Sequence, residues 1–134
     1  MSRNRYERGI SLVTTVLAFC FLLARAASGH HSFSAEFVAD KTATLKGTIT
    51  QVWFKNPHVR YLIAVQNDAG EEETWDARGS PVVWLARKGW TRDTIKVGDE
   101  VQIYGYLGRD GIKMLSIMTV TLADGTVLID KAPE

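Results

Sequence analysis

A single short helical segment stands among stretches that otherwise follow a β-strand pattern. In "GSPVVWLARKGW", residues 79–90, Ser80 can cap the free amides, Pro81 suits the first helical position and Gly89 supplies a left-handed stop. The predicted helix spans about two turns, so packing against the rest of the domain has to stabilise it. Because so short a helix buries little surface, strands must form most of the core. The helical side chains expected to face that core are Val82, Trp84 and Leu85.

Alternating apolar and polar residues predict strands on both sides of this helix. The first such segment ends at Pro57, and "NDAG", residues 67–70, is typical of a hairpin turn. Residues 30–41 show no clear period and are expected to lead into the domain as a semi-ordered arm. One face of the first strand carries Leu45, Gly47, Ile49, Gln51 and Trp53, and one face of the second carries Val59, Tyr61, Ile63 and Val65. The predicted strands are residues 42–54, 58–66, 71–78, 100–107, 112–122 and 127–129.

The order of three strands, one short helix and two or three further strands predicts the fold class. In about 100 residues it best suits a small OB-like Greek-key β-barrel of five to six strands, whose helix lies between strands three and four. The fold class is therefore all-β with one short helix, after an N-terminal signal helix.

The first 29 residues differ in kind from the rest of the chain. Three arginines precede the apolar stretch 10–23, and the small residues of "ARAASG" follow it, which is the tripartite pattern of a secretory signal peptide. An uncleaved membrane anchor is the alternative, but this stretch is shorter than the roughly 20 residues that a membrane-spanning helix needs. We expect a signal peptide over residues 1–29, a single domain over residues 30–134 and no stable membrane span after cleavage.

The domain after the signal has little net charge and no cysteine. Removing residues 1–29 leaves 12 basic and 14 acidic side chains, and Cys20 is removed with them. Binding to nucleic acid would call for a basic face, so no nucleic-acid partner is indicated. No disulfide can form, and the apolar core alone has to stabilise the fold.

Several strings together resemble a known family. They are "HHSFSAEF", "LKGTITQVWFKNPHV", "RKGWTRDTIKVGDEVQIYGY" and "TVTLADGTVL", and the likeness covers essentially all of residues 30–129. The chain resembles an uncharacterised family of small exported bacterial proteins, a domain of unknown function whose members begin with a His-His-Ser-Phe segment after the signal. This resemblance implies a periplasmic location and a small β-barrel, and it implies no established activity.

The three histidines of the domain, His30, His31 and His58, form a candidate metal site. Imidazole suits copper and zinc. If the signal is cut after Gly29, the free α-amine and the ring of His30 can chelate a metal together, and His31 or His58 could complete a nitrogen set that Cu(II) accepts. A cut after Ser28 would give "GHH", with a square-planar site that uses the ring of His31. A cut after Ala26 would leave neither histidine beside the amine.

Other interpretations stay open beside the metal site. The paired histidines can serve only as polar residues, and His58 can simply stabilise its turn by hydrogen bonding. The aromatic residues either fill the core or stack on a ligand at the OB face. These residues are Trp53, Phe54, Tyr61, Trp75, Trp84, Trp90, Tyr104 and Tyr106.

The sequence therefore predicts a binding role rather than catalysis. The chain lacks the Gly-x-Ser-x-Gly, phosphate-loop and HExxH motifs, and its domain lacks a cysteine nucleophile. The leading hypothesis is a periplasmic binding module for copper or another transition metal. The alternative is a structural or accessory domain that binds a protein or small organic ligand on its barrel face without a metal. A copper-dependent redox enzyme is a third hypothesis.

Overall fold

The computed structural model describes residues 33–131 of the chain. The chain divides into two compact units, residues 1–35 and residues 36–134. In the first unit the described residues, 33–35, are helical. The predicted signal peptide, with His30 and His31 after it, lies outside the described residues. None of the helices within residues 33–131 is long and apolar enough to cross a bilayer.

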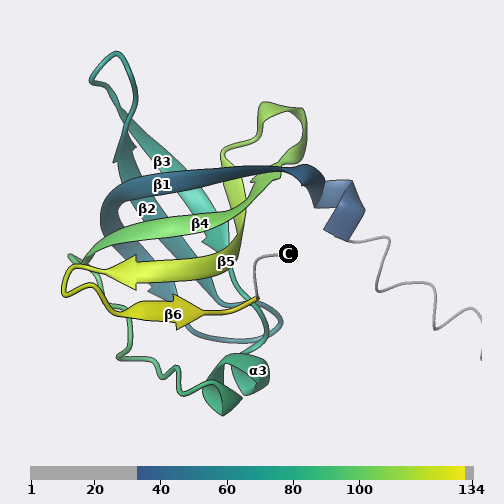
Figure 1. Ribbon diagram of the computed structural model, residues 1–134, viewed down its shortest axis with the longest axis vertical. Helices are drawn as coiled ribbons and strands as arrows, with labels where there is room; N and C mark the ends of the chain where they lie inside the picture. The colour runs from purple at the N-terminus through teal and green to yellow at the C-terminus, as the bar shows by residue number, and fades with distance from the viewer. Residues whose placement is uncertain (1–32, 132–134) are drawn as a thin grey trace, which may run out of the picture. The chain divides into compact units, whose positions relative to one another are not determined.

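Six strands form one sheet in the order β3-β2-β1-β4-β5-β6. All neighbouring strands are antiparallel, and a further parallel pairing of β3 with β5 closes β1 to β5 into a ring (Figure 1). The closed ring, with a helix between β3 and β4, confirms the predicted OB-like, mostly β fold. The elements are β1 (Phe37–Trp53), β2 (Arg60–Gln66), β3 (Glu72–Arg78), α3 (Val82–Arg87), β4 (Glu100–Gly108), the 3-10 turn η1 (Arg109–Gly111), β5 (Met114–Leu122) and β6 (Val127–Ile129).

The first strand begins earlier than the sequence pattern indicated. β1 starts at Phe37, which is 5% exposed and pairs with Gly108 of β4, so the semi-ordered arm predicted for residues 30–41 is wrong from Phe37 onward. The pairing of β1 with β4 shifts register between Phe37 and Thr42. This irregularity breaks the two-residue alternation by which a strand is recognised in sequence.

A bulge near the other end of β1 changes which side chains face the core. The pairing with β2 shifts register between Ile49 and Gln51, which leaves Thr50 as the extra residue. Beyond it Val52 and Phe54 pack against the core. The prediction that Gln51 and Trp53 share the face of Ile49 is therefore wrong, because one inserted residue reverses the alternation. Gln51 is exposed.

Gly47 lies where β1 and β2 come very close together. A Cβ atom built on Gly47 would lie 2.0 Å from the backbone oxygen of Ala64, a distance that no side chain tolerates. An isolated glycine inside a strand pattern commonly indicates a bulge or a close approach of another backbone. The structure shows a close approach of two backbones, and the bulge lies at Thr50.

Helix α3 lies at one end of the ring, beyond β6 in Figure 1. Of its predicted core residues, Leu85 is fully buried and Val82 packs at the edge of the core. Trp84, 60% exposed, was wrongly predicted to face the core. Successive helical residues point about 100° apart, so Trp84 lies off the face on which Val82 and Leu85 contact the core. Trp90, just after the helix, is buried instead.

The cap of α3 comes from a distant part of the chain. Ser80 was predicted to cap the helix, but no side chain of the preceding segment does so, because the helix begins at Val82 with Pro81 in the cap position. The backbone N–H of Val82 donates to Oδ1 of Asn56, 3.2 Å away. Asn56 therefore ties the β1–β2 loop to the start of α3. The predicted left-handed stop at Gly89 is confirmed, with φ of +86°.

The core fills the ring and continues beneath α3. Val59, just before β2, and Tyr61 and Ile63 on one face of β2 are fully buried, as the alternation predicted. The other buried side chains of the core cluster are Leu45, Ile49, Ala77, Leu85, Trp90, Ile95, Val101, Ile103, Leu115, Ile117 and Val120.

Candidate binding sites beside the β1–β2 loop

Of the three predicted metal ligands, only His58 lies among the described residues. It stands in the β1–β2 loop and is exposed. Its Nδ1 lies 3.3 Å from the backbone oxygen of Gly79. Since a carbonyl oxygen can only accept, Nδ1 carries the proton in this contact, and the lone pair of the neutral ring is then on Nε2. His58 thus offers an imidazole nitrogen to solvent.

Backbone hydrogen bonds hold His58 in this position. The N–H of Val59 donates to the oxygen of Ser80 at 3.3 Å, and the N–H of Gly79 donates to the oxygen of Val59 at 2.8 Å. The loop residues next to His58 are therefore paired with the segment that joins β3 to α3. A histidine whose second ring nitrogen is bonded to a backbone carbonyl is oriented in the way that metal-binding histidines usually are.

Within residues 33–131 no group of three His, Cys, Asp or Glu side chains could hold a metal ion. His58 therefore has no second and third ligand from this part of the chain. The predicted partners His30 and His31 lie outside it, and the metal site stays a prediction.

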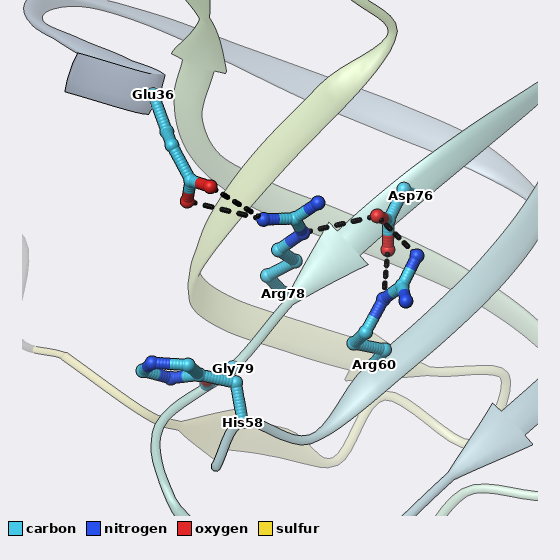
Figure 2. A network of polar contacts seen from close by, with 6 residues as sticks. All are labelled: Glu36, His58, Arg60, Asp76, Arg78 and Gly79. Atoms are coloured by element: carbon cyan, nitrogen blue, oxygen red, sulfur yellow. Dashed lines mark hydrogen bonds and ion pairs between the residues drawn. The ribbon is translucent and has the colours of Figure 1, made fainter. Parts of the chain in front are cut away.

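A network of ion pairs crosses β2 and β3 close to His58 (Figure 2). The carboxylate of Asp76 accepts two hydrogen bonds from Arg60, at 2.7 and 3.1 Å, and one from Nε of Arg78 at 3.0 Å. Arg78 in turn donates to both oxygens of Glu36. The ring of His58 points away from this network. Asp76 is fully engaged by two guanidinium groups, so the network fixes side chains rather than offering a free carboxylate.

The same network places a guanidinium over an aromatic ring. The central carbon of Arg60 lies 5.3 Å from the ring centroid of Trp53, its cross-strand partner in β1. This distance is within the range of a cation–π interaction. Asp76 of β3 binds the guanidinium of Arg60. Because Arg60 contacts the ring of Trp53, the position of Trp53 is constrained as well.

The aromatic side chains divide between core and surface. Tyr61 and Trp90 are buried, and Phe54 and Trp75 pack against the core. Trp84 is exposed, and Trp53 lies outside the core cluster because the bulge in β1 turns it outward. Core packing thus accounts for only part of the aromatic set.

Trp53 lines a cleft between the end of β1 and the segment that joins α3 to β4. Its volume is about 390 Å³, and the two walls are residues 52–55 and residues 92–97. Such a volume falls within the range of about 300–1,000 Å³ found for small-molecule pockets. The side chains that line the cleft are Val52, Trp53, Phe54, Lys55, Arg92, Ile95, Lys96 and Val97.

A buried polar cluster lies where the end of β6 meets the β3–α3 segment. Oδ2 of Asp130 accepts the backbone N–H of Ser80 at 2.8 Å, and the backbone oxygen of Asp130 accepts a hydrogen bond from Nζ of Lys88. Within residues 33–131, Oδ1 of Asp130 and the hydroxyl of Tyr61 have no hydrogen-bond partner. Burial, followed by the negative charge of Asp130, raises the pKa of the Tyr61 hydroxyl. Asp130 acts as a clamp between distant segments.

Comparison with known proteins assigns the chain to a family. A model described as a family of unknown function (DUF6152) matches residues 19–115. The chain belongs to the DUF6152 family. The predicted resemblance to a family of unknown function is thus confirmed, and the match includes the β1–β2 loop, α3 and the cleft of this DUF6152 protein. No curated protein and no solved structure matches the chain.

Sequence reasoning identified His58 but missed the cleft. The signal for one wall was present in the sequence, where Trp53, Phe54 and Lys55 follow one another. Arg92, on the opposite wall, makes no ion pair within residues 33–131. Only the folded ring brings this arginine and Lys96 opposite the end of β1.

Proposed function

We propose that the protein is a periplasmic binding module that takes copper or another late transition metal through the imidazoles of His30 and His31, with His58 as a further ligand. The observation that supports the proposal is the orientation of His58. Its Nδ1 is held by the oxygen of Gly79 and its exposed ring offers Nε2 outward. Late transition metals accept neutral imidazole nitrogen readily, and Cu(II) prefers a tetragonal set of nitrogen ligands.

Export and processing are part of this proposal. Intact mass of the protein recovered from the periplasm locates the N-terminus, and Cu(II) titration of the same material measures the affinity. A chain that begins at His30 supports chelation by its α-amine and ring. A chain that begins at Ala27, or a protein absent from the periplasm, contradicts the proposal.

Variants separate the ligands. We expect the double substitution His30→Ala with His31→Ala to abolish tight copper binding, and His58→Ala to weaken it if His58 belongs to the ligand set. A cytoplasmic form with Met before His30 keeps every imidazole and lacks the α-amine at His30, so it should bind copper much more weakly. Unchanged affinity in the double variant would disprove the metal hypothesis. Glu36→Gln, which changes a carboxylate of the ion-pair network, is the control.

A second candidate function is an accessory domain that binds a small organic ligand without a metal. The observation that favours it is the cleft lined by Trp53. The ring of Trp53 lies outside the core cluster, and the volume of the cleft suits a small molecule. Equilibrium binding measured on metal-free protein tests this candidate separately from the copper titration.

A further inference from the structure

The cleft at the end of β1 carries charge of one sign. Three of its lining side chains are charged, Lys55, Arg92 and Lys96, and all three are cations exposed to solvent. Within residues 33–131 none of them forms an ion pair. Three unpaired cations around one concave surface produce a positive potential that attracts anions.

Within residues 33–131 the nearest carboxylates in the sequence form no ion pair with these cations. Oδ2 of Asp99 accepts the backbone N–H of Lys96 at 2.8 Å and so stabilises the turn before β4. Asp93 is exposed beside Arg92, and neither aspartate lines the cleft. The domain as a whole is slightly acidic after residue 29, so a cleft lined by three cations is a local feature rather than a reflection of composition.

The other side chains that line the cleft are apolar, and the fold holds them in place. Ile95, 1% exposed, anchors one wall in the core, and Val97, 63% exposed, adds apolar surface at the rim. On the other wall the bulge in β1 turns Trp53 outward, and Arg60 fixes its ring from β2. Bulges commonly re-aim a side chain toward a functional site.

We propose that this cleft binds a small organic anion that carries a ring, such as an aromatic carboxylate. The anionic group contacts Lys55, Arg92 and Lys96, and the ring packs against Trp53. The inference names the site and the ligand class of the second candidate function, and it is independent of the metal ligands. A neutral aromatic compound lacks the negative charge that the three cations attract. A small anion without a ring makes no contact with the indole of Trp53.

Calorimetric titration of the full chain, freed of metal with EDTA, tests the proposal. The probe is 2-naphthoate, and 2-naphthylmethanol is the neutral compound with the same ring system. We expect the carboxylate to bind at least tenfold more tightly than the alcohol, and its affinity to fall as salt is raised from 20 to 300 mM, because salt screens exposed charges. Equal affinity for the two compounds, or no binding of naphthoate at millimolar concentration, would overturn the proposal.

Substitutions locate the binding site. Lys55→Gln, Arg92→Gln and Lys96→Gln should each weaken naphthoate binding about two- to fivefold, the usual effect of one exposed ion pair. Lys41→Gln, which removes an exposed cation of β1 outside the cleft, is the matched control and should leave the affinity unchanged. If the triple variant binds as well as the unsubstituted chain, or if the control weakens binding equally, the cleft is not the site.

A change at the aromatic surface tests the stacking contact. Trp53 lies outside the core cluster, so Trp53→Leu should leave the fold intact, as circular dichroism can verify. Stacking on an aromatic side chain contributes about 1–3 kcal/mol in nucleobase complexes, so at least a fivefold loss of affinity is expected. A leucine variant with unchanged affinity would disprove the stacking contact. Because no copper is present, none of these outcomes bears on the ligands His30 and His31.

Discussion

Oδ2 of Asp130 accepts the backbone N–H of Ser80 at 2.8 Å, which joins the residue after the last strand to the segment before α3. Asp130 is 1% exposed, and its own N–H donates to the oxygen of Met118 in β5. Three parts of the chain that are far apart in sequence therefore meet at one residue. This clamp explains how a three-residue strand and a helix of six residues are held against the ring.

Replacing Asp130 tests the clamp. Asp130→Ala leaves the N–H of Ser80 without its acceptor and should lower the free energy of unfolding by about 1.5–3 kcal/mol, as expected for a hydrogen bond to a charged group. Asp130→Asn keeps an oxygen in the same place and should lose less. Urea denaturation followed by circular dichroism measures both. Equal losses in the two variants would show that the negative charge, rather than the acceptor, stabilises the contact.

The helix cap from Asn56 gives a second prediction. Asn56→Ala removes the acceptor of the Val82 N–H and should lower the free energy of unfolding by about 1 kcal/mol, the usual effect of losing a cap. Asn56→Asp retains an acceptor and should restore most of that stability. Urea denaturation of the two variants at neutral pH makes the comparison. If alanine and aspartate behave alike, the contact does not stabilise α3.

The close approach at Gly47 gives a third prediction. In Gly47→Ala the new Cβ would meet the backbone oxygen of Ala64, so β1 and β2 would have to separate. Overpacking of this kind costs about 1–3 kcal/mol or more. The neighbouring substitution Lys46→Ala, on an exposed side chain, is the control. A thermal melt of Gly47→Ala that matches this control would contradict the register of β1 and β2.

Much of the fold could be predicted from the sequence because its signals are local. The alternation of Tyr61, Ile63 and Val65 predicts directly which face of β2 packs on the core, and Gly89 marks the end of the helix. The errors in the strands occur where the backbone departs from a regular period. No residue type in the sequence indicates the bulge at Thr50 or the register shift after Phe37.

The candidate sites were predictable only in part, since they depend on contacts between distant segments. Residue type alone marked His58 as a ligand, whereas its partner Gly79 is apparent only from the fold. The cleft is lined by Lys55 together with Arg92 and Lys96, which follow it by about 40 residues in the sequence. The outward position of Trp53 follows from the bulge, and for that reason the sequence pattern placed it on the wrong face.

The buried hydroxyl of Tyr61 makes the stability of the domain depend on pH at the alkaline end. Burial, with the charge of Asp130, raises the pKa of this hydroxyl above the ordinary tyrosine value of about 10. Above that pH the unfolded chain loses the proton while the folded chain keeps it. The unfolded state then binds fewer protons, so the free energy of unfolding falls as the pH rises. Below about pH 10 the contribution of Tyr61 is fully present.

Tyr61→Phe should remove this pH dependence. We expect the slope of the free energy of unfolding between pH 10 and 11.5 to become less negative by up to about 1.4 kcal/mol per pH unit, the equivalent of one proton. Near pH 7 the variant should be as stable as the unsubstituted chain, because the hydroxyl has no hydrogen-bond partner within residues 33–131 to lose. Tyr104→Phe, which removes a surface hydroxyl that donates to Thr42, is the matched control and should keep the original slope. Urea denaturation across this pH range decides the point: a Tyr61→Phe slope identical to that of the control would mean that Tyr61 loses its proton in the folded state as readily as in the unfolded one.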